Sequence, residues 1–185
     1  RMADRLDFQL LSIGLRRMGW VRFWIQAFLG VVVVAILLFS KVGTSLERNS
    51  SKVFGLGPGI AVTTLAFLVL LYSLWQGWLI VRLGRAVESD VRPSRGEASR
   101  LLKRGVFVDL FGLVLATVGY QAFAGPLFVQ AASVQPGFAI GAGMGNYAIT
   151  SLEILSVLGN TQVLFAHLIG LIISLWLLQR IYRTS

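Results

Sequence analysis

The sequence predicts an all-α membrane protein with four transmembrane helices, preceded by an amphipathic helix that lies in the membrane interface. Hydrophobic residues make up 56% of the 185 residues and charged residues only 14%, and the mean hydropathy is strongly positive. A helical segment of about 20 uncharged residues crosses a hydrocarbon layer of about 30 Å. Segments without a charged residue extend over residues 23–40, 53–81, 110–152 and 154–179.

The third of these segments is long enough for two spans, but its second half does not suit a helix. The sequence "VQPGFAIGAGMGNY" at residues 134–147 is rich in Gly and Pro, which interrupt helices. We therefore expect one membrane domain over residues 1–185 that contains four spans. The predicted transmembrane helices cover residues 20–40, 58–82, 105–130 and 152–180, and a basic loop covers residues 83–104.

Residues 3–18 have the pattern of an amphipathic helix. Leu6, Leu10 and Ile13 share one helical face, whereas Arg5 faces elsewhere. This pattern is typical of a helix that lies in the interface, with its arginines on anionic headgroups. The alternative is a helix that packs against the basic loop.

The distribution of basic residues predicts the orientation in the membrane. The net charge is +9, and fourteen of the 17 Lys and Arg residues lie around the start of the first span, between the second and third spans, or at the C-terminus. The positive-inside rule then places both termini and residues 83–104 in the cytoplasm or the stroma. Tryptophans settle at the headgroup level, and all five lie near the basic ends of their spans: Trp20, Trp24, Trp75, Trp78 and Trp176.

The clustered basic residues indicate contact with membrane lipids and no nucleic-acid partner. Lys and Arg next to a span are attracted to anionic headgroups. Nucleic-acid modules combine basic residues with interleaved aromatic residues or with a recognisable fold, and the basic loop has neither.

A helix start is predicted within the basic loop. Pro93 disfavours a helical conformation at Arg92. Ser94 and Glu97 then have the spacing of a capping box. We expect this pair to begin a short helix that leads into the third span.

Small residues recur on one face of the second and third spans. Steps of three and four place residues on the same side of a helix, and small residues there let two helix backbones approach closely in a membrane. The predicted packing positions are Ala66, Ser73, Gly77 and Gly84 on the second span, and Gly105, Asp109, Gly112, Ala116 and Gly119 on the third.

A polar stripe follows one face of the fourth span, while leucine and isoleucine cover the other faces. Polar and ionisable side chains are costly in lipid, so they are candidates for function and should point into the bundle. Gln162 lies off this stripe. The intramembrane polar stripe consists of Glu153, Ser156, Asn160, Val163, His167, Gly170 and Ser174.

Four roles compete for His167, the only histidine of the chain. The first is a hydrogen bond between helices, with Asp109 or an amide as its partner. The second is axial ligation of a chlorophyll or a haem, and the third is ligation of a transported metal ion. Catalysis is the fourth, but one histidine without a second acid, a nucleophile or a metal cluster makes no usable site. We therefore expect no enzymatic activity.

The absence of cysteine from the sequence narrows the chemistry further. It excludes a thiolate metal site, a thiol nucleophile and a disulfide framework. A transported metal ion would therefore need oxygen or nitrogen ligands, because the sulfur ligands are limited to three methionines.

Three segments resemble a four-span family that is shared by cyanobacteria and plastids. They are "LRRMGWVRFWIQAFLGVV", "RPSRGEASRLLKRG" and, most specifically, "GNTQVLFAHLIGLIISLWLLQRI". In the last segment, the family pattern matches the triplet Asn160 to Gln162, then Ala166 and His167, and then residues 174–178. Gln162 stands where the family has a second Asn.

The resemblance implies a non-enzymatic membrane component. The best-known plant member of this family is a small inner-envelope protein of chloroplasts, described both as part of the protein-import machinery and as an iron permease. The resemblance therefore implies a location in the plastid inner envelope or a cyanobacterial membrane. It also implies partners from the import machinery and iron as a bound or transported ion. The alternative is an accessory or scaffold subunit of a photosynthetic complex in the thylakoid, with chlorophyll or carotenoid as its cofactor and His167 as the pigment ligand for chlorophyll.

Overall fold

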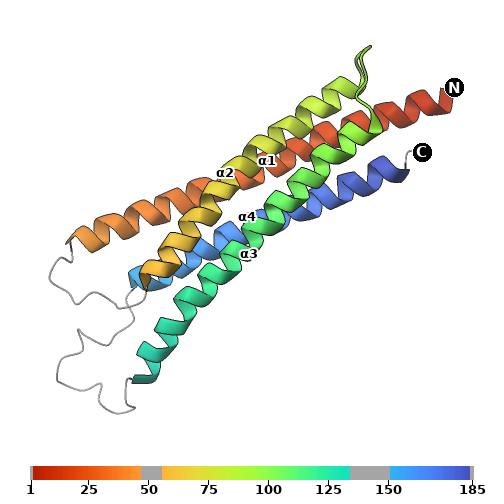
Figure 1. The fold of residues 1–185 in the computed structure, drawn as a ribbon. Helices are drawn as coiled ribbons and strands as arrows, with labels where there is room; N and C mark the ends of the chain where they lie inside the picture. Colours follow the sequence, from red (N-terminus) through yellow and green to blue (C-terminus); the bar gives the residue numbers. More distant parts are fainter. Residues whose placement is uncertain (1, 47–55, 134–150, 184–185) are drawn as a thin grey trace.

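The computed structural model describes residues 2–46, 56–133 and 151–183. These residues form four long helices (Figure 1): α1 (Met2–Leu46), α2 (Leu56–Val87), α3 (Arg95–Ser133) and α4 (Ser151–Arg183). Each helix contains a stretch long and apolar enough to cross a membrane. The prediction of an all-α protein with four spans is therefore confirmed.

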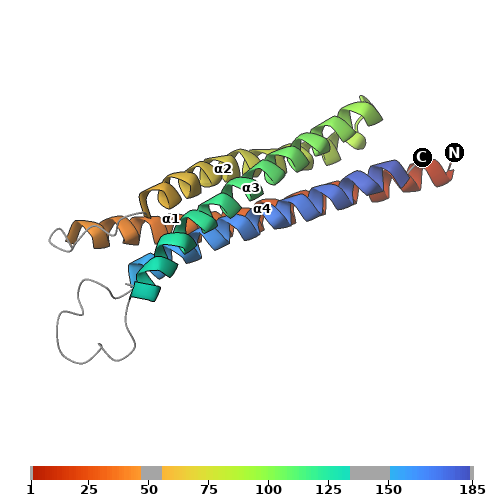
Figure 2. The same cartoon turned by 60° about the horizontal axis from the view of Figure 1, so that its bottom comes forward.

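The four helices pack as a ring. Each helix contacts the next one in the chain, and α4 also contacts α1. Across the ring, the backbones of α2 and α4 approach each other, whereas those of α1 and α3 do not. Both termini and the connection between α2 and α3 lie at one end of the bundle (Figures 1 and 2). We call this the basic end, because most Lys and Arg residues lie there.

The N-terminal segment differs from its prediction. Residues 3–18 are not a separate interfacial helix, because α1 continues without a break from Met2 to Leu46. Leu11 and Leu15 are buried in a cluster with apolar side chains of α2, α3 and α4. Leu10 and Ile13, on the face that suggested membrane binding, stay exposed. The neighbouring face with Leu11 and Leu15 is the one covered by the other helices, which extend beyond the predicted spans at this end.

The basic loop is also shorter than predicted. Helix α2 continues to Val87 and α3 begins at Arg95, so that only residues 88–94 connect them. The predicted capping box is present: the Ser94 N–H donates to Glu97 Oε2 at 2.9 Å, and the Glu97 N–H donates to Ser94 Oγ at 3.2 Å. These bonds satisfy two donors at the helix start that have no partner within the helix.

Replacing Ser94 with Ala is expected to cost about 1 kcal/mol of helix stability, because a first-turn N–H loses its acceptor. Hydrogen exchange of the first-turn amides of α3 should be faster in this variant. Asp90→Asn changes an exposed carboxylate in the same connection and serves as the control. Equal exchange in Ser94→Ala and the unchanged protein would contradict a stabilising role for the cap.

Apolar side chains fill the bundle on both sides of one polar layer. At the basic end lies the cluster around Leu15, Ile80, Leu102 and Leu177. Towards the other end, Val33, Ala66, Ala116 and Val163 form a second cluster. The polar layer between the two clusters is the candidate functional site.

Candidate functional site

Five polar side chains from all four helices meet inside the bundle, and we call them the central polar cluster. Each of the five has an exposed fraction of 0%. The cluster consists of Arg22 and Gln26 on α1, Ser73 on α2, Asp109 on α3 and His167 on α4.

Asp109 is the centre of the hydrogen-bond network. Its Oδ2 accepts a bond of 2.6 Å from Arg22 Nη2. Its Oδ1 accepts a bond of 2.6 Å from Ser73 Oγ and lies 3.0 Å from His167 Nδ1. Gln26 Nε2 lies 3.4 Å from the same oxygen. Both carboxylate oxygens are therefore engaged, and α3 is tied to the other three helices.

Arg22 bridges the long diagonal of the bundle. Because the backbones of α1 and α3 do not touch, only a long side chain on α1 reaches Asp109. The guanidinium also donates to the Ser73 carbonyl at 2.9 Å and to Ser73 Oγ at 2.9 Å. A planar group with several donors suits this arrangement better than an ammonium would.

His167 joins α4 to two other helices. Its Nδ1 lies 3.0 Å from Asp109 Oδ1, and its Nε2 lies 3.0 Å from the backbone carbonyl of Ala66 on α2. Of the four roles expected from the sequence, the hydrogen bond between helices is the one seen in the structure.

The predicted glycine positions make room for these polar side chains. A Cβ atom at Gly112 would overlap the His167 ring, and one at Gly77 would lie 3.3 Å from Arg22 Nη1. Gly105 lies beside Ser174 and the same guanidinium. The small residues thus serve side-chain packing across the bundle, in addition to the backbone approach for which they were singled out.

A second polar contact lies about two turns along α4 from His167. Asn160 Nδ2 donates to the Ala116 carbonyl on α3 at 2.8 Å, and Asn160 Oδ1 accepts from Thr63 Oγ1 on α2 at 2.8 Å. Gly119 leaves the space for this amide. Asn160 therefore links three helices, and Thr63 was not singled out from the sequence.

The remaining stripe residues are not all close to the cluster. Ser174 and Glu153 are buried and Ser156 is half-buried, as is Gln162, which lies off the stripe. Glu153 precedes His167 by about 21 Å along α4, at 1.5 Å per residue, so these two groups do not form one site. Within residues 2–46, 56–133 and 151–183, no group of three His, Asp or Glu side chains is placed to hold a metal ion.

Arg22 and Gln26 are the cluster residues whose role sequence reasoning missed. Arg22 was assigned to the basic residues that orient the protein, yet it is fully buried. A signal was available, because Arg22 and Gln26 are four residues apart and share one face of a predicted span that has no other charged or amide side chain. Asp109 within a span also needed a cationic partner.

The comparisons with known proteins give the family. The chain matches a family described as "Protein of unknown function (DUF3611)" over residues 6–182. It belongs to this family. The resemblance to the family of cyanobacteria and plastids is thereby confirmed, and the matched range includes every residue of the central polar cluster.

The chain is also similar to "Protein TIC 21, chloroplastic" of Arabidopsis thaliana. The two are 30% identical over 184 residues, which cover 98% of this chain and 60% of the relative. The chain therefore spans only about three fifths of that protein's length. No solved structure matches.

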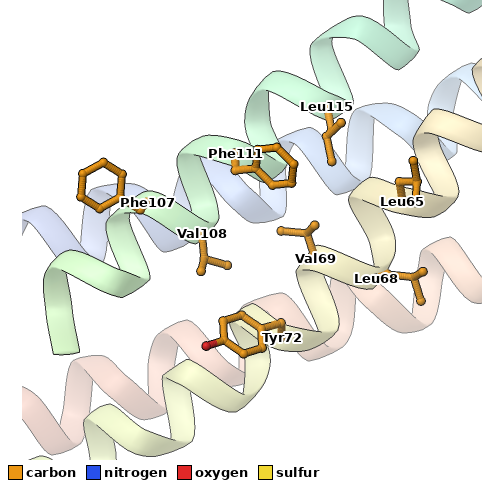
Figure 3. Close-up of a pocket in the computed structure, with 8 residues that line it drawn as sticks. All are labelled: Leu65, Leu68, Val69, Tyr72, Phe107, Val108, Phe111 and Leu115. Carbon is orange, nitrogen blue, oxygen red and sulfur yellow. The ribbon is translucent and has the colours of Figure 1, made fainter.

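The outer surface of the helix bundle carries an apolar groove of about 580 Å³ between α2 and α3 (Figure 3). Its only hydroxyl is that of Tyr72, so the groove offers almost no ligand atoms for a metal ion. None of its residues belongs to the central polar cluster. The lining residues are Leu65, Leu68, Val69, Tyr72, Phe107, Val108, Phe111 and Leu115.

Proposed function

We propose that the protein is a non-enzymatic subunit of a membrane assembly in a plastid or cyanobacterial membrane. By resemblance, its family is one of import or permease components. A substrate path, where one exists, is formed by partner subunits together with this bundle. The chloroplastic relative supports the plastid location. The basic residues support a stromal or cytoplasmic position for the termini.

The occupation of Asp109 by Arg22 is the observation that carries this proposal. An iron path along the bundle axis would need carboxylate or imidazole ligands that are open to the ion. Here the carboxylate is already paired with a fixed guanidinium at 2.6 Å. A second cation at the same carboxylate would meet repulsion from Arg22 in a medium of low dielectric.

The same geometry supports a non-enzymatic role. Ser73, Asp109 and His167 are the residue types of a hydrolytic triad, but a triad needs the hydroxyl on the imidazole. In this cluster the Ser73 hydroxyl donates to the carboxylate instead. All three side chains are also fully buried.

We also propose a structural role for His167 in place of pigment or metal ligation. An axial ligand presents a ring nitrogen with a free lone pair, whereas both ring nitrogens here lie 3.0 Å from protein oxygens. The accessory role in a photosynthetic complex gains no support from the comparisons.

Lipids at the basic end are proposed as further partners. The Arg82 guanidinium lies 4.9 Å from the Trp78 ring centre, and that of Arg180 lies 5.0 Å from the Trp176 ring centre. Such pairs place a charge and an indole together at the headgroup level.

Transport by the purified chain tests the proposal. The full chain is reconstituted into liposomes that contain a fluorescent iron chelator, and Fe²⁺ is added outside. The expected rate of iron entry equals that of protein-free liposomes. Saturable entry that is lost in Asp109→Asn, a variant whose folding is checked by circular dichroism, would overturn the proposal.

A second measurement tests whether the chain is a subunit of a larger membrane complex. The protein is released gently from its native membranes, and the mass of the particle is compared with that of the pure chain in the same detergent. A particle that contains other membrane proteins in fixed proportion is expected. A particle of the chain alone, together with iron entry in liposomes, would identify a self-sufficient permease.

A further inference from the structure

Both ring nitrogens of His167 face hydrogen-bond acceptors. Nε2 lies 3.0 Å from the Ala66 carbonyl, which has no proton to donate, and Nδ1 lies 3.0 Å from Asp109 Oδ1. A neutral imidazole has one N–H and one lone pair. With a neutral ring, one of these two short contacts would bring together two lone pairs.

The proton between His167 and Asp109 belongs on the imidazole. Asp109 already accepts bonds of 2.6 Å from the Arg22 guanidinium and from the Ser73 hydroxyl. A cation and a hydroxyl donor at a carboxylate both favour its ionised form. The carboxylate therefore accepts at both oxygens, and Nδ1 must be the donor.

We propose that His167 is a proton-binding site, at which the folded bundle holds a second proton on the imidazole. The central polar cluster then contains two cations, Arg22 and His167, and one anion, Asp109. Its net charge is one positive, inside the bundle.

The charged groups around the ring come from two helices only, among the described residues. Helix α1 supplies Arg22 and α3 supplies Asp109, which faces the ring directly. Helix α2 presents the uncharged Ser73 and the Ala66 carbonyl. On α4 itself, Glu153 lies about 21 Å away along the helix.

The second proton links three helices. With it, one imidazole donates to α2 through the Ala66 carbonyl and to α3 through Asp109 at the same time. Loss of the proton removes one of these bonds and leaves two lone pairs in contact. The packing of α4 against α2 and α3 is therefore coupled to proton binding.

The single histidine makes a direct test possible. A sample labelled with ¹⁵N at histidine reports on His167 alone, because the chain has no other histidine. The full chain is placed in lipid nanodiscs at neutral pH, and the ¹⁵N resonances of the ring are recorded. We expect both ring nitrogens to be protonated. One unprotonated ring nitrogen would overturn the proposal.

Two variants test whether the Asp109 carboxylate causes the second protonation of His167. In Asp109→Asn the size of the side chain is kept but the negative charge is removed, so that one ring nitrogen should lose its proton. In Asn160→Ala the polar contact about two turns away is removed, and both ring nitrogens should stay protonated. Unchanged protonation in a folded Asp109→Asn would overturn the role of the carboxylate. If that variant does not fold, the spectrum of the unchanged protein decides alone.

Discussion

Asp109→Asn is expected to destabilise the bundle by about 3–5 kcal/mol, because it leaves the Arg22 charge buried without its anion. The guanidinium has an exposed fraction of 0% and is 2.6 Å from the carboxylate. The variant keeps the volume of the side chain, so packing alone is not affected. Unfolding by a denaturing detergent, followed by circular dichroism, measures the loss.

A matched control lies on the same helix. The Thr117 side chain is exposed and bonds only to the Leu113 carbonyl of its own helix, so Thr117→Val should change stability by less than about 0.5 kcal/mol. A similarly small loss in Asp109→Asn would mean that Arg22 finds another partner or water.

The double variant separates the buried charge from the rest of the network. Asp109→Leu alone leaves an isolated guanidinium, whereas Arg22→Met with Asp109→Leu removes both charges. Replacing a whole buried ion pair with apolar residues is often nearly neutral. The double variant should therefore be more stable than Asp109→Leu, with a coupling energy of up to about 3 kcal/mol.

Gly112→Ala is expected to reduce stability by about 1–3 kcal/mol, because an overpacked core forces neighbours out of place. The new Cβ would overlap the imidazole of His167. The ring has little freedom to move, since both of its nitrogens are held at 3.0 Å by oxygens of α2 and α3. The same unfolding assay measures the loss.

The sign of the change makes this test decisive. Within a helix, Ala is favoured over Gly by up to about 1 kcal/mol when nothing else changes. Gly96→Ala on the same helix supplies this reference, because the added Cβ would meet only Ser94 Oγ, at an ordinary contact distance of 3.9 Å. We expect Gly96→Ala to be neutral or stabilising. A stabilising Gly112→Ala would contradict the close packing of the ring against α3.

The inward direction of the polar stripe was predictable from spacing alone. Asn160, His167 and Ser174 lie seven residues apart on one face of α4, and all three are fully buried. The capping box of Ser94 and Glu97 was equally local, and it is present at the start of α3. Such features depend on residues close in sequence, so the sequence contains enough information to place them.

The N-terminal segment shows where the same reasoning fails. An apolar face at helical spacing is buried equally well by lipid headgroup regions or by other helices. Leu10 and Ile13 stay exposed, whereas Leu11 and Leu15 beside them pack against helices that continue beyond the predicted spans. Hydropathy marks only the part of a helix that suits the membrane, so it did not show that α2 and α3 extend this far.

Arg22 shows the second limit. Its position near the start of a span fits the positive-inside rule, and only its four-residue spacing from Gln26 distinguishes it from Arg16 and Arg17. Its burial depends on Asp109, which is 87 residues away in the chain. Gly77 and Gly105 then supply the space for the guanidinium.

The sequence by itself determined that this is a four-span helical membrane protein and which face of the second, third and fourth spans turns inward. These properties follow from composition and from periodicity along single helices, whereas the family follows from the resemblance of three sequence segments. Only the tertiary structure decided which polar groups meet. The physical reason is that the register between helices and the unequal diagonals of the bundle place Arg22, Asp109 and His167 together, and neither property is encoded by the spacing along one helix.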